Sequence, residues 1–265
     1  MYFENMVDRE DKERLGEIVT NLLITDLSES EYMRVVSSQR LYDILKLLGR
    51  EGEKKINQEV ATQVATKVGA RWMLLGNILQ VKPQVIVTSQ LVDVGSGKVV
   101  ASQRITGEAG EKIFSMVDKL TVEVKKDLSL PAVARQEPDP LVAEVTTHSP
   151  EAYRYYLEGM DYYNKWYSTE AAKSFRKALE FDSTFAMAYY RLADLTWENE
   201  LIVKAVEYSD KVSQKERSYI KSLEARISED YKQAITELQK ITERYPQEKE
   251  VFYQLGVCYR ELGQY

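Results

Sequence analysis

The sequence predicts two parts: an α/β domain in which helices cover a mixed sheet, then an all-α superhelix of paired helices. Three observations lead to this prediction. In the first half the apolar residues change from a spacing near 3.6 to a spacing near 2, which marks helices followed by strands. A proline-rich seam follows. After it, small and aromatic residues recur at a fixed interval, which is the mark of a repeat array.

The composition is that of a globular protein with room for about two domains. The chain has 265 residues, of which 44% are hydrophobic and 29% are charged. Its net charge of −6 provides no basic face, so we expect no nucleic acid partner. The sequence has no apolar run long enough for a membrane helix, and its first residues are too polar for a signal sequence. We therefore expect no membrane insertion by this chain.

The chain has too few soft ligands for a zinc site built from histidine and cysteine. Its one cysteine, Cys258, lies in a helical pattern and is expected to be a small core residue. Its one histidine, His148, precedes a predicted helix and is expected to be a solvated linker residue. We expect no disulfide, metal site or cofactor.

A seam over residues 131–150 divides the chain into a domain at 1–130 and a repeat region at 151–265. Proline lacks a backbone donor and disfavours helix in the residue before it, so this span is predicted to be an extended linker. The prolines of the span are Pro131, Pro138, Pro140 and Pro150.

The first domain is predicted to contain four helices, with a short strand-like run at residues 32–37. Asn57 is a natural helix N-cap, and Gly69 suits the end of the same helix. The predicted helices cover residues 14–29, 39–50, 57–70 and 110–128.

Three runs rich in β-branched and apolar residues follow the third of these helices, and they predict an antiparallel meander. They cover residues 71–81, 84–94 and 98–108. The sequence "GSGK" between the last two lacks the other residues of a phosphate-binding loop and does not lead into a helix, so it predicts a hairpin turn.

This order of elements, with "FENM" closing a first strand, "LGEIVTNLLITDLS", "EVATQVATKVGARWMLLGNI" and "SQLVDVGSGKVVASQRI", resembles the amino-terminal domain of TolB-type proteins and the related FlgO and CsgG-like families. The resemblance covers about residues 2–130. It implies a non-enzymatic α/β domain, usually extracytoplasmic, that acts in assembly or sensing, and it brings no catalytic residues. Only Met1 and Tyr2 precede Phe3, so the first strand is predicted to be truncated.

The region after residue 150 repeats with a period of about 34 residues, which is the period of tetratricopeptide repeats. Tyr155, Gly159, Ala171 and Ala178 recur as Tyr189, Ala193, Ala205 and Val212. The resemblance to tetratricopeptide repeats covers residues 151–265 and implies three hairpins plus the first helix of a fourth. Because the spacing shortens before Ala234, we expect a shortened first helix or turn in the third repeat.

In such arrays the first helix of each pair lines a concave groove that binds a protein or peptide. Lys and Asn, which hold a terminal carboxylate in some relatives, are replaced here by Tyr156 and Met160, so an extended or helical partner with apolar anchors is expected. The resemblance implies that partner-binding residues include Tyr156, Met160, Tyr163, Asn164, Tyr190, Asp194, Trp197, Arg226, Tyr253 and Arg260.

The leading prediction is a non-catalytic scaffold or sensor module of a bacterial envelope or signalling protein. The alternative is the regulatory part of a larger kinase, cyclase or transcriptional regulator whose effector domain lies upstream. Carboxylate pairs such as Glu198 and Glu200 are read as a solvated helix end and not as a hydrolase site. An extracytoplasmic or periplasmic compartment follows from the family resemblance alone. The cytoplasm and any oligomeric state stay open.

Overall fold

The computed structural model describes residues 1–50, 56–109, 112–128, 130 and 140–264. The chain forms two compact units, Met1–Val142 and Ala143–Tyr265. The first is an α/β unit and the second is helical, as the sequence predicts.

The α/β unit is built on a four-stranded mixed sheet with the strand order β1-β2-β3-β4. β1 runs parallel to β2, whereas β2, β3 and β4 form the predicted antiparallel meander. The bounds are β1 Tyr2–Asn5, β2 Trp72–Gln80, β3 Gln84–Asp93 and β4 Val99–Ala109.

A glycine lets the first strand pack closely on the sheet. Phe3 pairs with Gly76 across β1 and β2, and Phe3 is only 2% exposed. A Cβ atom on Gly76 would lie 2.1 Å from the Phe3 ring and 2.5 Å from the carbonyl oxygen of Thr88. Any side chain at position 76 would therefore displace the ring from the core.

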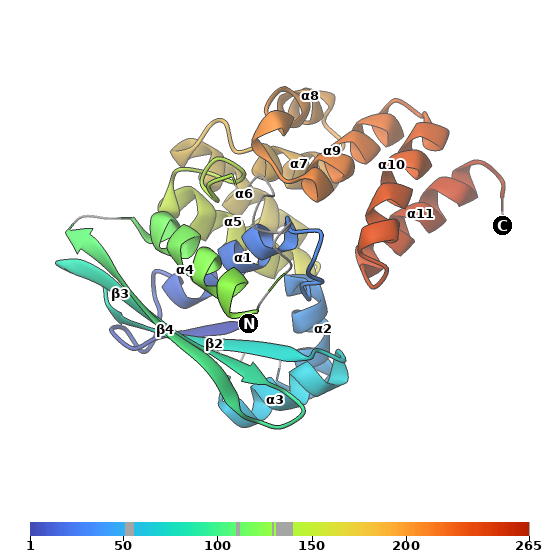
Figure 1. Cartoon of the computed structure of the whole chain (residues 1–265). Helices are drawn as coiled ribbons and strands as arrows, with labels where there is room; N and C mark the ends of the chain where they lie inside the picture. The colour runs from blue at the N-terminus through green and yellow to red at the C-terminus, as the bar shows by residue number, and fades with distance from the viewer. Residues whose placement is uncertain (51–55, 110–111, 129, 131–139, 265) are drawn as a thin grey trace. The chain divides into compact units, whose positions relative to one another are not determined.

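Helices cover the two faces of the sheet unequally (Figure 1). α1 (Leu15–Ser28) and α4 (Ile113–Asp127) pack against each other and against the strands on one face. On the other face α3 (Gln58–Lys67) packs its alanines against Met73 and Val92. α2 (Ser38–Leu47) packs on α3.

Most local predictions for this unit are confirmed. The Asn57 side chain accepts a hydrogen bond from the Val60 amide and caps α3, and Gly69 has the positive φ that a helix end needs. The prediction of a strand-like run at residues 32–37 was wrong. This segment has no ladder partner among the described strands, and its last residue, Ser37, is extended so that its hydroxyl caps α2.

The helical unit contains consecutive helix pairs. α5 packs against α6, α7 against α8, and α9 against α10, and α11 packs on α10. The bounds are α5 Pro150–Asn164, α6 Ser168–Phe181, α7 Ala186–Thr196, α8 Asn199–Glu207, α9 Gln214–Ile227, α10 Tyr231–Arg244 and α11 Lys249–Glu261.

The second helix of each pair buries the small residue that the repeat pattern singled out. Ala171, Ala205 and Ala234 have no exposed surface. The shortening lies elsewhere than expected, because α9 has a full 14 residues whereas α8 has only 9. A 3-10 turn, Ser209–Lys211, follows α8 and leads the chain toward α9.

The turn after the first helix of each pair has the same local backbone. A residue with positive φ stands there each time, and near it a backbone N–H usually bonds a carbonyl five residues earlier, as in Tyr167 to Tyr162. The positive-φ residues are Trp166, Trp197, Glu229 and Gly263. Glycine suits this conformation, and tryptophan does not.

We expect Trp166→Gly to raise the free energy of unfolding by about 0.5–1 kcal/mol. The left-handed backbone of a residue with a Cβ costs about 1–2 kcal/mol, and the greater freedom of glycine in the unfolded chain offsets part of this gain. Trp166 is 84% exposed, so little packing is lost. Urea unfolding followed by circular dichroism measures the change. Trp166→Ala, which keeps a Cβ, is the control, and an equal gain from it would contradict the explanation.

The predicted linker is only partly described, since residues 131–139 lie outside the described residues. The part that is described packs closely. The Val142 N–H donates to the Asp118 carboxylate, and the Thr147 hydroxyl donates to Asp182. Val142 and Thr147 are buried. His148 is exposed, as expected.

Across the described residues, no helix combines the length and the apolar character that crossing a membrane requires. In the same part of the chain, no group of three or more His, Cys, Asp or Glu residues could hold a metal ion.

Candidate interaction surfaces

The ten sequence-predicted partner-binding residues lie on α5, α7, α9 and α11 or directly after them, but they differ in exposure. Tyr253 and Trp197 are 67% and 53% exposed, and Arg260 is exposed as well. Tyr190 has no exposed surface, and Arg226 is 6% exposed. The half-buried members are Tyr156, Met160, Tyr163, Asn164 and Asp194.

Tyr156 and Met160 belong to the core of the first helix pair. The Tyr156 ring lies 5.8 Å from the Phe175 ring and 4.9 Å from the Phe185 ring. Met160 packs on the same cluster. Burial raises the pKa of Tyr156 to about 12, and the nearby Arg191 opposes the shift. Both residues therefore stabilise the hairpin, whatever surface they also present.

Arg191 is the centre of a polar network that the sequence did not reveal. It comes from α7 and is 6% exposed. Its guanidinium lies 5.0 Å from the centre of the Tyr163 ring and 5.1 Å from that of the Tyr190 ring. A cation held over two aromatic rings in a dry site is strongly attracted to them.

Glu250 of α11 binds Arg191 in a bidentate manner. Nη1 donates to Oε1 at 2.5 Å and Nη2 donates to Oε2 at 3.1 Å. Burial alone would raise the pKa of Glu250, but Arg191, together with Lys215 and Arg226, holds it below its usual value. The carboxylate is thus charged and lies in the field of three cations.

A second ion pair supports the first. Lys215 of α9 binds Glu248, the residue that precedes α11. Burial lowers the pKa of Lys215 to about 8, while Glu250 and Glu216 oppose the shift. The Lys215 ammonium also lies 4.7 Å from the centre of the Tyr245 ring. Lys215 stays largely charged at neutral pH.

Hydrogen bonds complete the connection between α7 and α11. The Gln254 side-chain amide donates to the Tyr190 hydroxyl at 3.3 Å and to Glu250 at 3.3 Å. These contacts account for the complete burial of Tyr190, together with its ring contact to Tyr219 at 6.1 Å. The expectation that Tyr190 lines an open groove therefore does not describe this conformation.

Asp194 links the other predicted residues. It accepts a hydrogen bond from the Tyr163 hydroxyl at 2.7 Å and forms an ion pair with Arg226 at 3.8 Å. The Arg226 guanidinium lies 5.1 Å from the centre of the Trp197 ring. This arrangement joins α5, α7 and α9 through their predicted groove residues. Arg260 on α11 pairs with its neighbour Glu261.

The sequence gives little indication of Arg191 and Glu250, the two residues of this network that the sequence analysis did not select. Arg191 follows the predicted groove residue Tyr190 directly, so its type alone did not distinguish it from a surface arginine. Glu250 is 59 residues further along the chain. Neither the repeat period nor the charge pattern connects the two.

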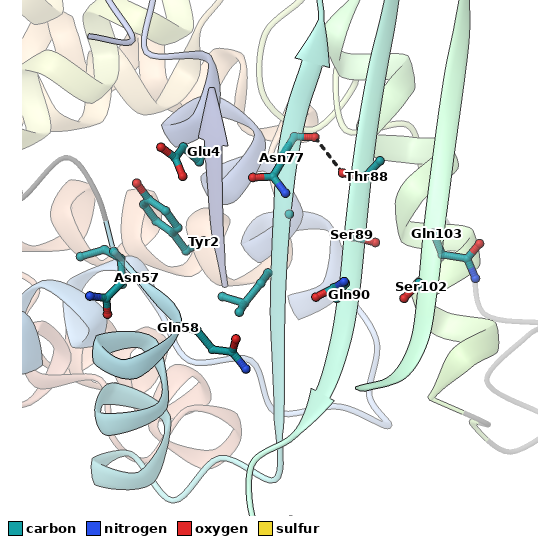
Figure 2. A pocket seen from close by; sticks show the side chains of 13 residues that line it. Tyr2, Glu4, Asn57, Gln58, Asn77, Thr88, Ser89, Gln90, Ser102 and Gln103 are labelled. Carbon is teal, nitrogen blue, oxygen red and sulfur yellow. Dashed lines mark hydrogen bonds between the residues drawn. The ribbon is translucent and has the colours of Figure 1, made fainter. Parts of the chain in front are cut away.

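The α/β unit has a polar hollow of about 480 Å³ on the part of its sheet face beside α3 (Figure 2). Tyr2 and Glu4 lie on β1 at one side, Asn57 and Gln58 lie at the start of α3, and Gln90 lies on β3. The Thr88 hydroxyl donates to the Asn77 carbonyl at 3.5 Å within it. The hollow is open and lined mostly by amides and hydroxyls, which suits a polar contact surface.

The architecture defines the chain as a mixed-sheet α/β domain joined to a region of paired helices. Residues 2–109 match the model of a family described as FlgO protein, and they form a FlgO-like domain. This match supports the FlgO part of the sequence resemblance. The likeness to TolB-type proteins gains no support from it, and the tetratricopeptide repeats stay a prediction.

Solved structures offer weaker likenesses. The LpoB C-terminal domain from Salmonella enterica is 23% identical, with a TM-score of 0.26, over 28% of this chain and 55% of that chain. The LpoB C-terminal domain from Escherichia coli is 24% identical, with a TM-score of 0.25, over 27% of this chain and 53% of that chain. A PelC variant from Paraburkholderia phytofirmans, solved as a dodecamer, is 21% identical, with a TM-score of 0.27, over 49% of this chain and 86% of that chain.

The chain spans about half the length of the two LpoB structures. A comparison with curated proteins finds no match.

Proposed function

We propose that this chain is a non-catalytic protein-interaction module of the bacterial envelope, with scaffold or sensor function. Its FlgO-like domain supports the envelope assignment, because the family resemblance implies extracytoplasmic assembly or sensing. The helical unit, as a tetratricopeptide-like array, binds a protein partner through the surface formed by α5, α7, α9 and α11.

The observation that carries the proposal is the exposure of aromatic side chains on and beside these first helices. Trp197 and Tyr253 expose more than half of their surfaces although large apolar groups are favoured inside. Aromatic rings give a large contact area at a small loss of conformational freedom, which is why they are common at binding sites. Phe252 of α11 is also 51% exposed, and exposed apolar groups of this size can mark an interaction surface.

Site-specific photo-crosslinking in a bacterium that encodes the protein tests this proposal. A photoreactive phenylalanine analogue at Trp197 or Tyr253 should crosslink one defined protein, and the product should fractionate with the cell envelope. The analogue at Val203 of α8, which is 55% exposed on a second helix, is the matched control. Equal crosslinking from Val203, no product, or a product in the cytosolic fraction would contradict the proposal.

A further inference from the structure

Two buried cations and one partly exposed cation of the helical unit form a group that we name the cation centre: Arg191 of α7, Arg226 of α9 and the partly exposed Lys215 of α9. Their side chains are 7%, 6% and 20% exposed. Buried cations are rare in proteins unless a structure provides carboxylates for them. Bringing two buried cations and a third, partly exposed one into the field of the Glu250 carboxylate is therefore a built feature of this unit.

The cation centre is shaped for a carboxylate. Aromatic rings on α5 and α7 hold the Arg191 guanidinium in place, so that its two terminal nitrogens point toward one partner. The planar guanidinium matches a carboxylate with two parallel hydrogen bonds, which adds directional specificity.

The polar groups of the cation centre are not all satisfied from within. Among the described residues, the buried Nε atoms of Arg191 and Arg226 have no hydrogen-bond partner, and neither has Gln254 Oε1. Buried polar atoms without partners are uncommon in native proteins and call for a ligand or water. The site thus has recognition capacity beyond the contacts that α11 makes with it.

The present occupants belong to the start of α11. Glu250 binds Arg191 and Glu248 binds Lys215, so two carboxylates two residues apart meet two cations on two other helices. In contrast, Arg226 pairs with Asp194, which would remain if α11 moved. Removing α11 would free two of the three cations.

We propose that the cation centre is the recognition site for an acidic segment of the partner protein, whose Asp or Glu side chains replace Glu248 and Glu250. In the free protein the start of α11 occupies the site as an internal competitor. This inference rests on the proposed function and names the chemistry of its partner. The acidic segment binds only when the start of α11 leaves the cation centre. The ion pairs of Glu248 and Glu250 therefore both stabilise α11 and control access to this site.

The test measures binding of a fluorescein-labelled, amidated Glu-Ala repeat peptide by fluorescence anisotropy. Glu248→Gln with Glu250→Gln should raise the affinity about tenfold, because a larger fraction of the protein has a free site. Arg191→Gln should abolish binding. The matched control, Glu224→Gln with Glu243→Gln, changes the same charge at exposed positions and should leave the affinity within about twofold.

Two further peptides identify the source of the carboxylate. A Gln-Ala peptide of the same length with an amidated end should not bind. The same neutral peptide with a free carboxyl end should not bind either, and binding of this peptide alone would overturn the assignment to side-chain carboxylates.

Hydrogen exchange on the unmodified protein tests the competition without any variant. Saturating Glu-Ala peptide should speed amide exchange in α11 and leave α1 unchanged. Continued protection of α11 in the complex, equal affinity after Arg191→Gln, or no gain from the Glu248 and Glu250 variant would overturn the inference. Crosslinking from Trp197 and Tyr253 to an envelope protein would then still stand, so the two proposals fail separately.

Discussion

Glu250→Ala is expected to lower the free energy of unfolding of the helical unit by about 3–5 kcal/mol. Removing one member of a buried ion pair leaves the other charge without compensation in a dry site. Here the charge left without its partner is that of Arg191, whose side chain is 7% exposed. In a Trp72→Phe background the remaining tryptophans, Trp166 and Trp197, both belong to the helical unit, so urea unfolding followed by fluorescence reports on this unit.

The matched control for this prediction is Glu207→Ala. Glu207 pairs with Lys204 on α8 at 2.7 Å, but both side chains are about half exposed, and such pairs contribute little to stability. We expect no measurable change. If Glu250→Ala also left the free energy of unfolding unchanged, the contact between α7 and α11 would not stabilise the unit in solution.

Phe175→Ala is the second large effect, with an expected loss of about 3–5 kcal/mol in the free energy of unfolding. Phe175 of α6 has no exposed surface. Its ring fills the space beside Gly159, where a Cβ atom would lie 2.5 Å from the ring. The truncation opens a cavity between α5 and α6 that the backbone of a helix pair cannot close. The same urea experiment measures it.

Phe181→Ala on the same helix is the control for the cavity. Phe181 is 46% exposed, and its ring stacks on Tyr155 at 5.5 Å. We expect a loss below about 1 kcal/mol, since less apolar area leaves water and no void forms. A comparable loss from both variants would show that ring stacking, and not core packing, dominates this helix.

The elements could be predicted from the sequence because their signals are local. Apolar alternation marks β2, β3 and β4, and Asn57 and Gly69 mark the ends of α3 through their own backbone preferences. The prediction of a strand at residues 32–37 failed because β-branched residues are compatible with a strand but do not form one by themselves. Whether a strand forms depends on a neighbour that offers hydrogen bonds.

The candidate site could be predicted only in outline. Repeat phase pointed to the first helices, and two of the residues that it selected, Trp197 and Tyr253, are exposed, while their role as groove residues stays a prediction. It did not indicate that Tyr190 is covered, because the covering residues Glu250 and Gln254 come from a helix two pairs later. Contacts of this range depend on the curvature of the whole unit, which no short window of sequence contains.

The pairing of Arg191 with Glu250 has a consequence for how the helical unit unfolds. Stacked helical hairpins usually behave as a one-dimensional chain, in which each hairpin is stabilised by its immediate neighbours and the ends fray first. A strong contact that passes over α9 and α10 couples the second pair to the last helix. Unless another carboxylate takes the place of Glu250, loss of α11 weakens α7 directly, so in the free protein α11 and the middle of the unit melt in one cooperative transition.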